Sequence, residues 1–121
     1  MNQPQISQND ANMVDARHYT YRVEWSADDG EFVATVLEYP SLSWLDVDQA
    51  AALAGLVRLV ERVIEDMTDN GETVPEPFGE RRFSGQFMIR TTAAVHRRLT
   101  IEAAERHTSL NKVAIERLTK V

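Results

Sequence analysis

The stretch 84–91 places the strongest constraint on how this chain can fold. Its side chains alternate strictly, as they do in a strand with two different faces. Gln86, Met88 and Arg90 lie on one side of the extended chain, and Phe87 and Ile89 lie on the other. Only two helical patterns follow, and a single strand cannot form a sheet. We therefore expect this strand to pair with the same strand of a second copy of the chain.

Two short helices are expected behind this strand. Thr91 or Thr92 can cap a helix from about 93 to 106, and Ser109 can cap a last helix after a break at 107–108. A strand and two helices of this length bury too little apolar surface to be stable alone, so dimerisation is the expected remedy. The predicted dimer core is Phe87, Ile89, Val95, Leu99, Leu110, Val113, Ala114 and Leu118; Ala103 and Val121 extend the two helical stripes.

A two-stranded antiparallel ribbon of this kind fits the major groove of DNA. The side chains available to the bases would be those of Gln86, Met88 and Arg90. Glutamine can pair bidentately with adenine and arginine with guanine, each worth about 1–3 kcal/mol of discrimination. Met88 could touch a thymine methyl group or add nothing specific. The alternative is an exposed edge strand with ordinary polar residues.

The front of the chain predicts a small α+β domain. Alternating strands are expected at 18–26 and 31–39, joined by a turn at 27–30 whose Asp-Gly pair suits a tight hairpin, and 41–45 could be a third strand. Asp46 is the expected N-cap of a helix that runs to about Thr68. Its apolar stripe consists of Leu53, Leu56, Val57, Val60, Val63, Ile64 and Met67. Residues 1–17 are polar and are expected to form a flexible tail.

Charge divides the chain at the expected linker, 79–83. Residues 1–80 contain 16 acidic and 4 basic side chains, a net charge of −12, whereas residues 81–121 contain 9 basic and 3 acidic ones, a net charge of +6. A basic segment can meet phosphates, and an acidic one suits a basic protein partner. Solvated surfaces with no partner are the alternative for both segments.

The composition narrows the function further. There is no cysteine, which excludes a disulfide framework, a thiol nucleophile and a cysteine-ligated zinc site. No segment reads as a signal peptide or as a membrane span, so we expect a cytoplasmic protein that needs no cofactor and no membrane.

Two parts of the chain resemble known families. Residues 84–121 resemble an Arc-type ribbon-helix-helix DNA-binding domain, through the strand 85–90, the helix start 95–99 and the helix start 109–111. Residues 19–78 are similar to the front domain of HicB-type antitoxins. The matching pieces are 21–23 with 25–26, 29–34, 39–43, the alanine-rich helix start 50–53 and Val74-Pro75-Glu76-Pro77.

The resemblance implies an antitoxin of a type II toxin–antitoxin system. Residues 18–78 would form a partial RNase H-like domain that blocks a small basic HicA-like toxin, an mRNA-cleaving ribonuclease. Residues 84–121 would form a homodimer, which could pair into a tetramer, and would repress the operon at a palindromic operator. The implied base contacts are Gln86, Met88 and Arg90; the implied phosphate contacts are Ser109, Leu110 and Asn111, with Arg97 and Lys112 as further candidates. Solvated surface charge explains Arg97, Arg98 and Lys112 equally well.

Two other functions must be weighed. An RNase H-like enzyme needs several carboxylates that converge on two metal ions. Glu24, Asp28, Asp29, Glu31 and Glu38 are the candidates. Turn formation explains Asp28 and Asp29 better, so we expect no catalytic residues and no metal site. Glu24, Asp28, Asp29 and Glu31 are instead candidates for toxin contact. The remaining alternative is an orphan ribbon-helix-helix repressor whose front domain binds a ligand or another protein.

Overall fold

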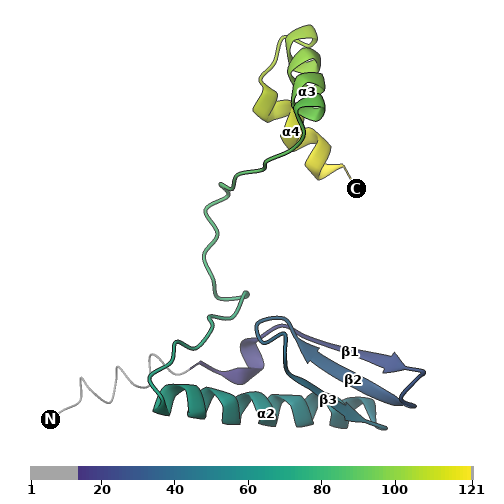
Figure 1. Cartoon of the computed structure of the whole chain (residues 1–121), viewed down its shortest axis with the longest axis vertical. Coiled ribbons are helices and arrows are strands. Elements are labelled where there is room, and N and C mark those ends of the chain that lie inside the picture. The colour runs from purple at the N-terminus through teal and green to yellow at the C-terminus, as the bar shows by residue number, and fades with distance from the viewer. Residues whose placement is uncertain (1–13, 121) are drawn as a thin grey trace, which may run out of the picture. The chain divides into compact units, whose positions relative to one another are not determined.

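A computed structural model describes residues 14–120 of the chain (Figure 1). The chain divides into two compact units, with the boundary between Arg82 and Phe83, and each unit is described by itself. Residues 1–13 of the expected tail, and Val121 of the last helical stripe, lie outside the described residues. No helix in the described range combines the length and the apolar character that a membrane crossing requires.

The first unit is a three-stranded antiparallel sheet with one long helix. Its strands, β1 (Tyr21–Ser26), β2 (Glu31–Val36) and β3 (Ser43–Asp46), lie in the order β1-β2-β3. The helix α2 (Gln49–Asp69) runs along one face of this sheet, as Figure 1 shows. The predicted α+β class is confirmed, and so is the third strand.

The β1–β2 hairpin follows directly from its turn residues. Gly30 has a φ of 67°, a conformation that glycine adopts without strain. The Ser26 hydroxyl donates a hydrogen bond to the Asp29 carboxylate over 2.8 Å and holds the turn. The strands are shorter than expected, because η1 (Ala16–His18) precedes β1 and the chain turns at Leu37 and Glu38 after β2.

The start of α2 differs from the prediction by two residues. Asp48, not Asp46, is the N-cap, and its carboxylate accepts a hydrogen bond from the Ala51 N–H over 2.8 Å. Asp46 still pairs with Phe32 at the end of β3, so its backbone belongs to the sheet. The helix ends at Asp69, close to the expected Thr68; Asn70 is its C-cap, and Gly71 follows with a φ of 73°.

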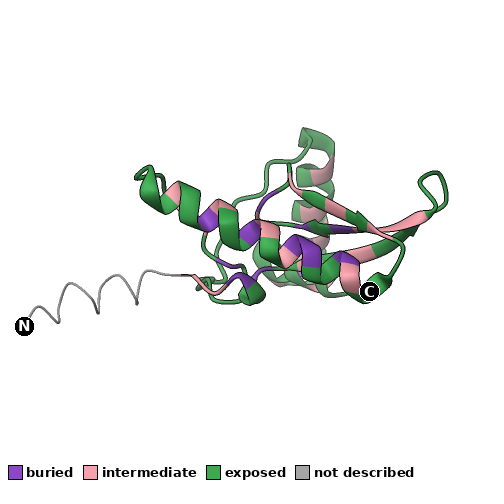
Figure 2. Cartoon of the chain, turned by 90° about the horizontal axis from the view of Figure 1, so that it is seen from below, coloured by how far each residue is buried: buried purple, intermediate pink, exposed green. Residues whose placement is uncertain are grey.

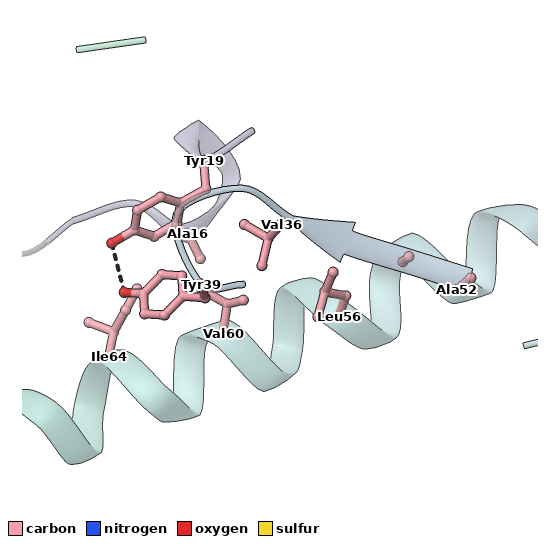
Figure 3. Close-up of a cluster of buried hydrophobic side chains, with 9 residues drawn as sticks. Ala16, Tyr19, Val36, Tyr39, Ala52, Leu56, Val60 and Ile64 are labelled. Carbon is pink, nitrogen blue, oxygen red and sulfur yellow. Dashed lines mark hydrogen bonds between the residues drawn. The ribbon is translucent and has the colours of Figure 1, made fainter. Parts of the chain in front are cut away.

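The core lies between the sheet and α2 (Figures 2 and 3). Ala34 and Val36 of β2 meet buried side chains of α2. The buried residues of the cluster are Ala16, Tyr19, Ala34, Val36, Tyr39, Ala52, Leu56, Val60 and Ile64. Ala16 is only 3% exposed, so the part of the expected tail that the structure describes enters this fold. Leu53, expected in the apolar stripe, is instead 38% exposed.

The proline-rich segment after α2 closes on the start of the first unit. The Tyr19 hydroxyl donates a hydrogen bond to the Pro75 carbonyl over 2.7 Å and also lies 2.9 Å from the Tyr39 hydroxyl (Figure 3 shows the tyrosine pair). Pro77 is fully buried, and the Glu38 carboxylate accepts a hydrogen bond from the Phe78 N–H. The segment 74–78 therefore belongs to the first unit.

The second unit contains two helices, α3 (Ala93–Glu105) and α4 (Leu110–Thr119). Thr92 and Ser109 cap them through their hydroxyls, as predicted for Ser109 and for one of the two threonines. Between the helices His107 takes a φ of 54°, which produces the sharp reversal. Ala103 and Val113 are the buried residues of the two helices.

Candidate dimer and nucleic-acid interface

The segment 84–91 forms no strand in the described chain, and it bends at Gly85, where φ is 85°. We expected a strand here, paired with a second copy; the single chain offers it no partner, so its backbone cannot form a ladder. All its side chains are exposed, with Phe87 at 75% and Met88 at 80%. Exposed large apolar side chains at consecutive positions indicate a surface that another chain covers.

An apolar groove of about 720 Å³ opens between this segment and the two helices. Six of the eight residues predicted for the dimer core line it: Ile89, Val95, Leu99, Leu110, Ala114 and Leu118. Their spacing on α3 and α4 places them on one side of the helix pair. The second unit thus leaves a continuous apolar surface uncovered.

The other two predicted core residues lie elsewhere. Val113 is fully buried within the second unit, so it holds α3 and α4 together and is not on the open surface. Phe87 does not line the groove. Arg90 and Thr91, by contrast, lie at its edge next to Ile89.

The start of α4 presents backbone donors, as expected for a phosphate site. The Ser109 hydroxyl accepts a hydrogen bond from the Lys112 N–H over 3.0 Å, which gives one N–H group of the first turn its acceptor. No intrahelical acceptor exists for the N–H groups of Leu110 and Asn111, the first two residues of the helix. The positive end of the helix dipole reinforces these donors toward an anion.

The basic side chains of the second unit divide into two sets. Arg106 and Arg117 form ion pairs with Glu102, and Arg106 also lies 2.8 Å from Glu116, so these charges join α3 to α4. The hydrogen bond from Arg106 lowers the pKa of Glu116 and raises that of Arg106. Within residues 14–120, five basic side chains of this unit form no ion pair: Arg90, Arg97, Arg98, Lys112 and Lys120. The charges of Lys112 and Lys120 also help to lower the pKa of Glu116.

Arg97 and Arg98 lie on a different side of α3 from the apolar groove. They line a shallow depression of about 460 Å³ together with Ala94, Ile101 and Glu105. The structure therefore does not bring Arg97 together with Val95 and Leu99, although all three belong to one helix.

Four of the five candidate carboxylates of the first unit lie at the β1–β2 hairpin. Glu24 and Glu31 lie on the paired strands, and Asp28 and Asp29 lie in the turn between them. In the part of the chain that the structure describes, no group of three or more His, Asp or Glu side chains could hold a metal ion. Glu38 is used structurally, since it accepts hydrogen bonds from Thr20 and Phe78.

The comparison with protein families reaches the same part of the chain as the apolar groove. Residues 70–118 match the HicB family. No curated protein and no solved structure matches the chain. The match supports a HicB-type antitoxin, but its position differs from our expectation, because it covers the segment that resembles an Arc-type domain and leaves residues 14–69 unmatched.

Proposed function

We propose that this chain is an antitoxin that forms a homodimer through residues 84–121 and represses its own operon. The observation that supports this best is the open apolar groove, which lies within the segment that matches the HicB family. A groove lined by Ile89, Leu99 and Leu118 would expose apolar surface to water in a monomer. A second copy would cover it and would supply the missing strand for the ladder at 84–91.

The paired strands then form the ribbon that enters the major groove of an operator. In this arrangement Phe87 and Ile89 face the helices, while Gln86, Met88 and Arg90 face the bases. The N–H groups of Leu110 and Asn111, helped by Lys112, bind a flanking phosphate and set the register. The twofold axis of the dimer requires a palindromic operator. This is the arrangement of a ribbon-helix-helix domain.

The first unit, in this proposal, binds and neutralises a small basic HicA-like ribonuclease and has no catalytic role. Its charge is the supporting observation: residues 1–80 have a net charge of −12. Such a surface attracts a protein that binds RNA and repels nucleic acid. The toxin would be blocked by occlusion of its RNA-binding face. The sheet with one helix is the partial RNase H-like domain of the proposed antitoxin.

The test joins both activities in one experiment. The full-length protein, tagged and expressed from its native gene neighbourhood, is purified and its stoichiometric partners are identified by mass spectrometry. We expect a basic protein of small size, encoded by an adjacent reading frame, whose cleavage of mRNA stops when the full-length chain is added. The same preparation should bind the promoter DNA of this gene pair. Recovery of the homo-oligomer alone would contradict the antitoxin assignment.

One observation favours a second candidate function. The family match begins at residue 70, so most of the first unit lies outside the part of the chain that supports the antitoxin assignment. An orphan repressor whose first unit binds a different ligand would still bind promoter DNA in this experiment but would recover no basic partner.

A further inference from the structure

One face of the sheet is covered by no helix or strand of the first unit. The Trp44 indole lies against α2, so close to Gly55 that a Cβ there would be 2.1 Å from its Nε1. Because side chains alternate along a strand, Ser43 and Leu45 must point to the opposite face. Among the described residues of the first unit, the three strands contact each other and α2, and no other helix or strand of that unit. We call this second face the open sheet face.

Apolar side chains lie at the centre of the open sheet face. The register places Glu24 of β1, Val33 of β2 and Leu45 of β3 side by side in one row across the sheet. Leu45 is 39% exposed, although its row is in the middle of the sheet. Leu37 is also on this face, because it pairs with Thr20 just beyond β2, and it is 53% exposed.

Carboxylates border this apolar centre on the hairpin side. Glu24 shares the row of Val33, and Glu31 pairs with Ser26 in the next row toward the turn, where Asp28 and Asp29 follow. Arg22, in the row of Thr35 and Ser43, is the basic side chain of this face. The exposed side of α2 is different, because it mixes both signs: Arg58, Glu61, Arg62, Glu65 and Asp66.

The apolar centre and the bordering carboxylates indicate which kind of partner the open sheet face can bind. A nucleic acid would be repelled by the carboxylates, and a second copy would bring the same carboxylates against them. An apolar centre with a rim of one charge is how a protein interface achieves both burial and register. A basic protein is the occupant that meets both conditions.

We propose that the open sheet face, centred on Val33 and Leu45 and bordered by Glu24 and Glu31, is the surface on which the basic protein partner docks. This inference rests on the proposed antitoxin function, and it adds which of the two sides of the first unit makes the contact. Leu45 is buried against the partner, and the two glutamates meet lysine or arginine side chains at the rim.

The test uses the full-length protein and the purified small basic protein recovered with it as the probe. Leu45→Lys is compared with Leu53→Lys, since the two leucines are 39% and 38% exposed but lie on opposite sides of the sheet. The double variant Glu24→Lys/Glu31→Lys is compared with Glu61→Lys/Glu65→Lys, which makes the same charge change on α2. Thermal unfolding of each variant is measured as a control for loss of the fold.

We expect the two sheet variants to raise the Kd of the complex by about 100-fold, as loss of a central contact or of rim charge pairs does, and the two α2 variants by less than about threefold. Equal binding by wild type and sheet variants, or a selective loss in the α2 variants, would overturn the docking surface while the antitoxin function stands. A change in oligomeric state caused by Leu45→Lys alone would overturn it in favour of a second copy. Failure of the wild type to recover any basic protein would contradict the proposed function itself.

Discussion

At the scale of single residues, Gly55 is the position where the packing of α2 on the sheet is tightest. Glycine inside a helix normally costs about 1 kcal/mol relative to alanine. Here the absent Cβ is what allows the Trp44 indole to lie against the helix, at a position where added atoms would be 2.1–2.4 Å away. The ring therefore joins β3 to α2 at the expense of helix propensity.

Gly55→Ala should lower the free energy of unfolding of the first unit by about 1–3 kcal/mol, because the new methyl group must displace a packed ring. Urea denaturation followed by tryptophan fluorescence measures this, since both tryptophans of the chain, Trp25 and Trp44, lie in the first unit. The control is Gly55→Ala in a Trp44→Val background, where the clash is absent and the substitution should become neutral or stabilising. A stabilising effect in the wild-type background would contradict this packing.

Glu38 is the carboxylate that ties the end of β2 to the segment that leaves α2. Partial burial acts to raise its pKa, but the hydrogen bonds from the N–H groups of Phe78 and Thr20 and from the Thr20 hydroxyl outweigh it. The net pKa lies below the ordinary value of 4.5. The ionised form therefore stabilises the fold above that value, and this contribution is lost as the pH falls through the lowered pKa.

Glu38→Gln should reduce the free energy of unfolding at pH 7 by about 1 kcal/mol, because the amide has one acceptor oxygen where the partly exposed carboxylate has two, so the N–H group of Thr20 or of Phe78 loses its acceptor. As the pH falls below the ordinary glutamate range, the wild type loses this advantage and the two proteins should converge. Denaturation series at neutral and acidic pH measure the difference. A constant gap at every pH would show that Glu38 acts through packing and not through its charge.

At the scale of helices and strands, the sequence predicted what is decided locally. The caps at Thr92 and Ser109 and the turn ending in Gly30 are confirmed, because each depends on contacts within three residues. The N-cap of α2 was assigned to Asp46 in place of Asp48, since the pairing of Asp46 with Phe32 is a contact between distant parts of the chain.

In the candidate interface, too, the sequence did not predict features that depend on contacts between distant residues. Helical spacing identified Leu99, Leu110 and Leu118 as groove residues, but it could not separate Val113, which is buried within the unit, from its neighbour Ala114, which lines the groove. That distinction depends on how α3 and α4 cross. The alternation of 84–91 predicts a strand whose hydrogen-bond partner lies outside the single chain, so the dimer ladder stays a prediction.

Leu99→Asp should convert the dimer to a monomer, because a carboxylate in the covered groove would lose its water without gaining a partner. Sedimentation equilibrium measures the change. The matched control is Ile101→Asp, two positions further along α3, since Ile101 is exposed and lies in the depression with Arg97 and Arg98 and not in the groove. A Leu99→Asp protein that remained dimeric would remove the groove from the interface.

The strand and the start of α4 should differ in what their mutation does to DNA binding. Arg90→Ala should reduce the binding free energy for the operator by about 1–3 kcal/mol and relax the preference for one base pair. Lys112→Ala should lower the affinity for all DNA sequences alike and reduce the slope of log affinity against log salt concentration by about one. Binding titrations on operator and scrambled DNA at several salt concentrations distinguish the two. Unchanged operator affinity for Arg90→Ala would exclude it from base recognition.

At the scale of the whole molecule, charge and packing divide the chain in the same place. The buried cluster of the first unit is complete between Ala16 and Ile64, with the segment 74–78 packed onto it. Among residues 83–120 of the second unit, only Ala103 and Val113 are buried, and the apolar groove of this unit is open. We therefore expect the first unit to be stable alone and the second to need a partner.

A fragment of residues 1–82 should fold as a monomer, keep the thermal transition that tryptophan fluorescence reports in the full chain, and bind the basic partner without binding DNA. The fragment must include Glu80, which pairs with His18. It must also include Pro75 and Phe78, which form hydrogen bonds with Tyr19 and Glu38.

The matched control is a fragment of residues 1–73, which lacks those three contacts and the buried Pro77. The shorter fragment loses the burial of Pro77, the part-buried hydrogen bond from Tyr19 to Pro75 and the exposed one from Phe78 to Glu38. Each hydrogen bond is worth about 0.5–1.5 kcal/mol, so this fragment should unfold at a clearly lower temperature. If both fragments melted alike, the segment 74–82 would serve only as a linker. If the longer fragment folded but bound DNA and not the basic partner, the two activities would be assigned to the wrong units.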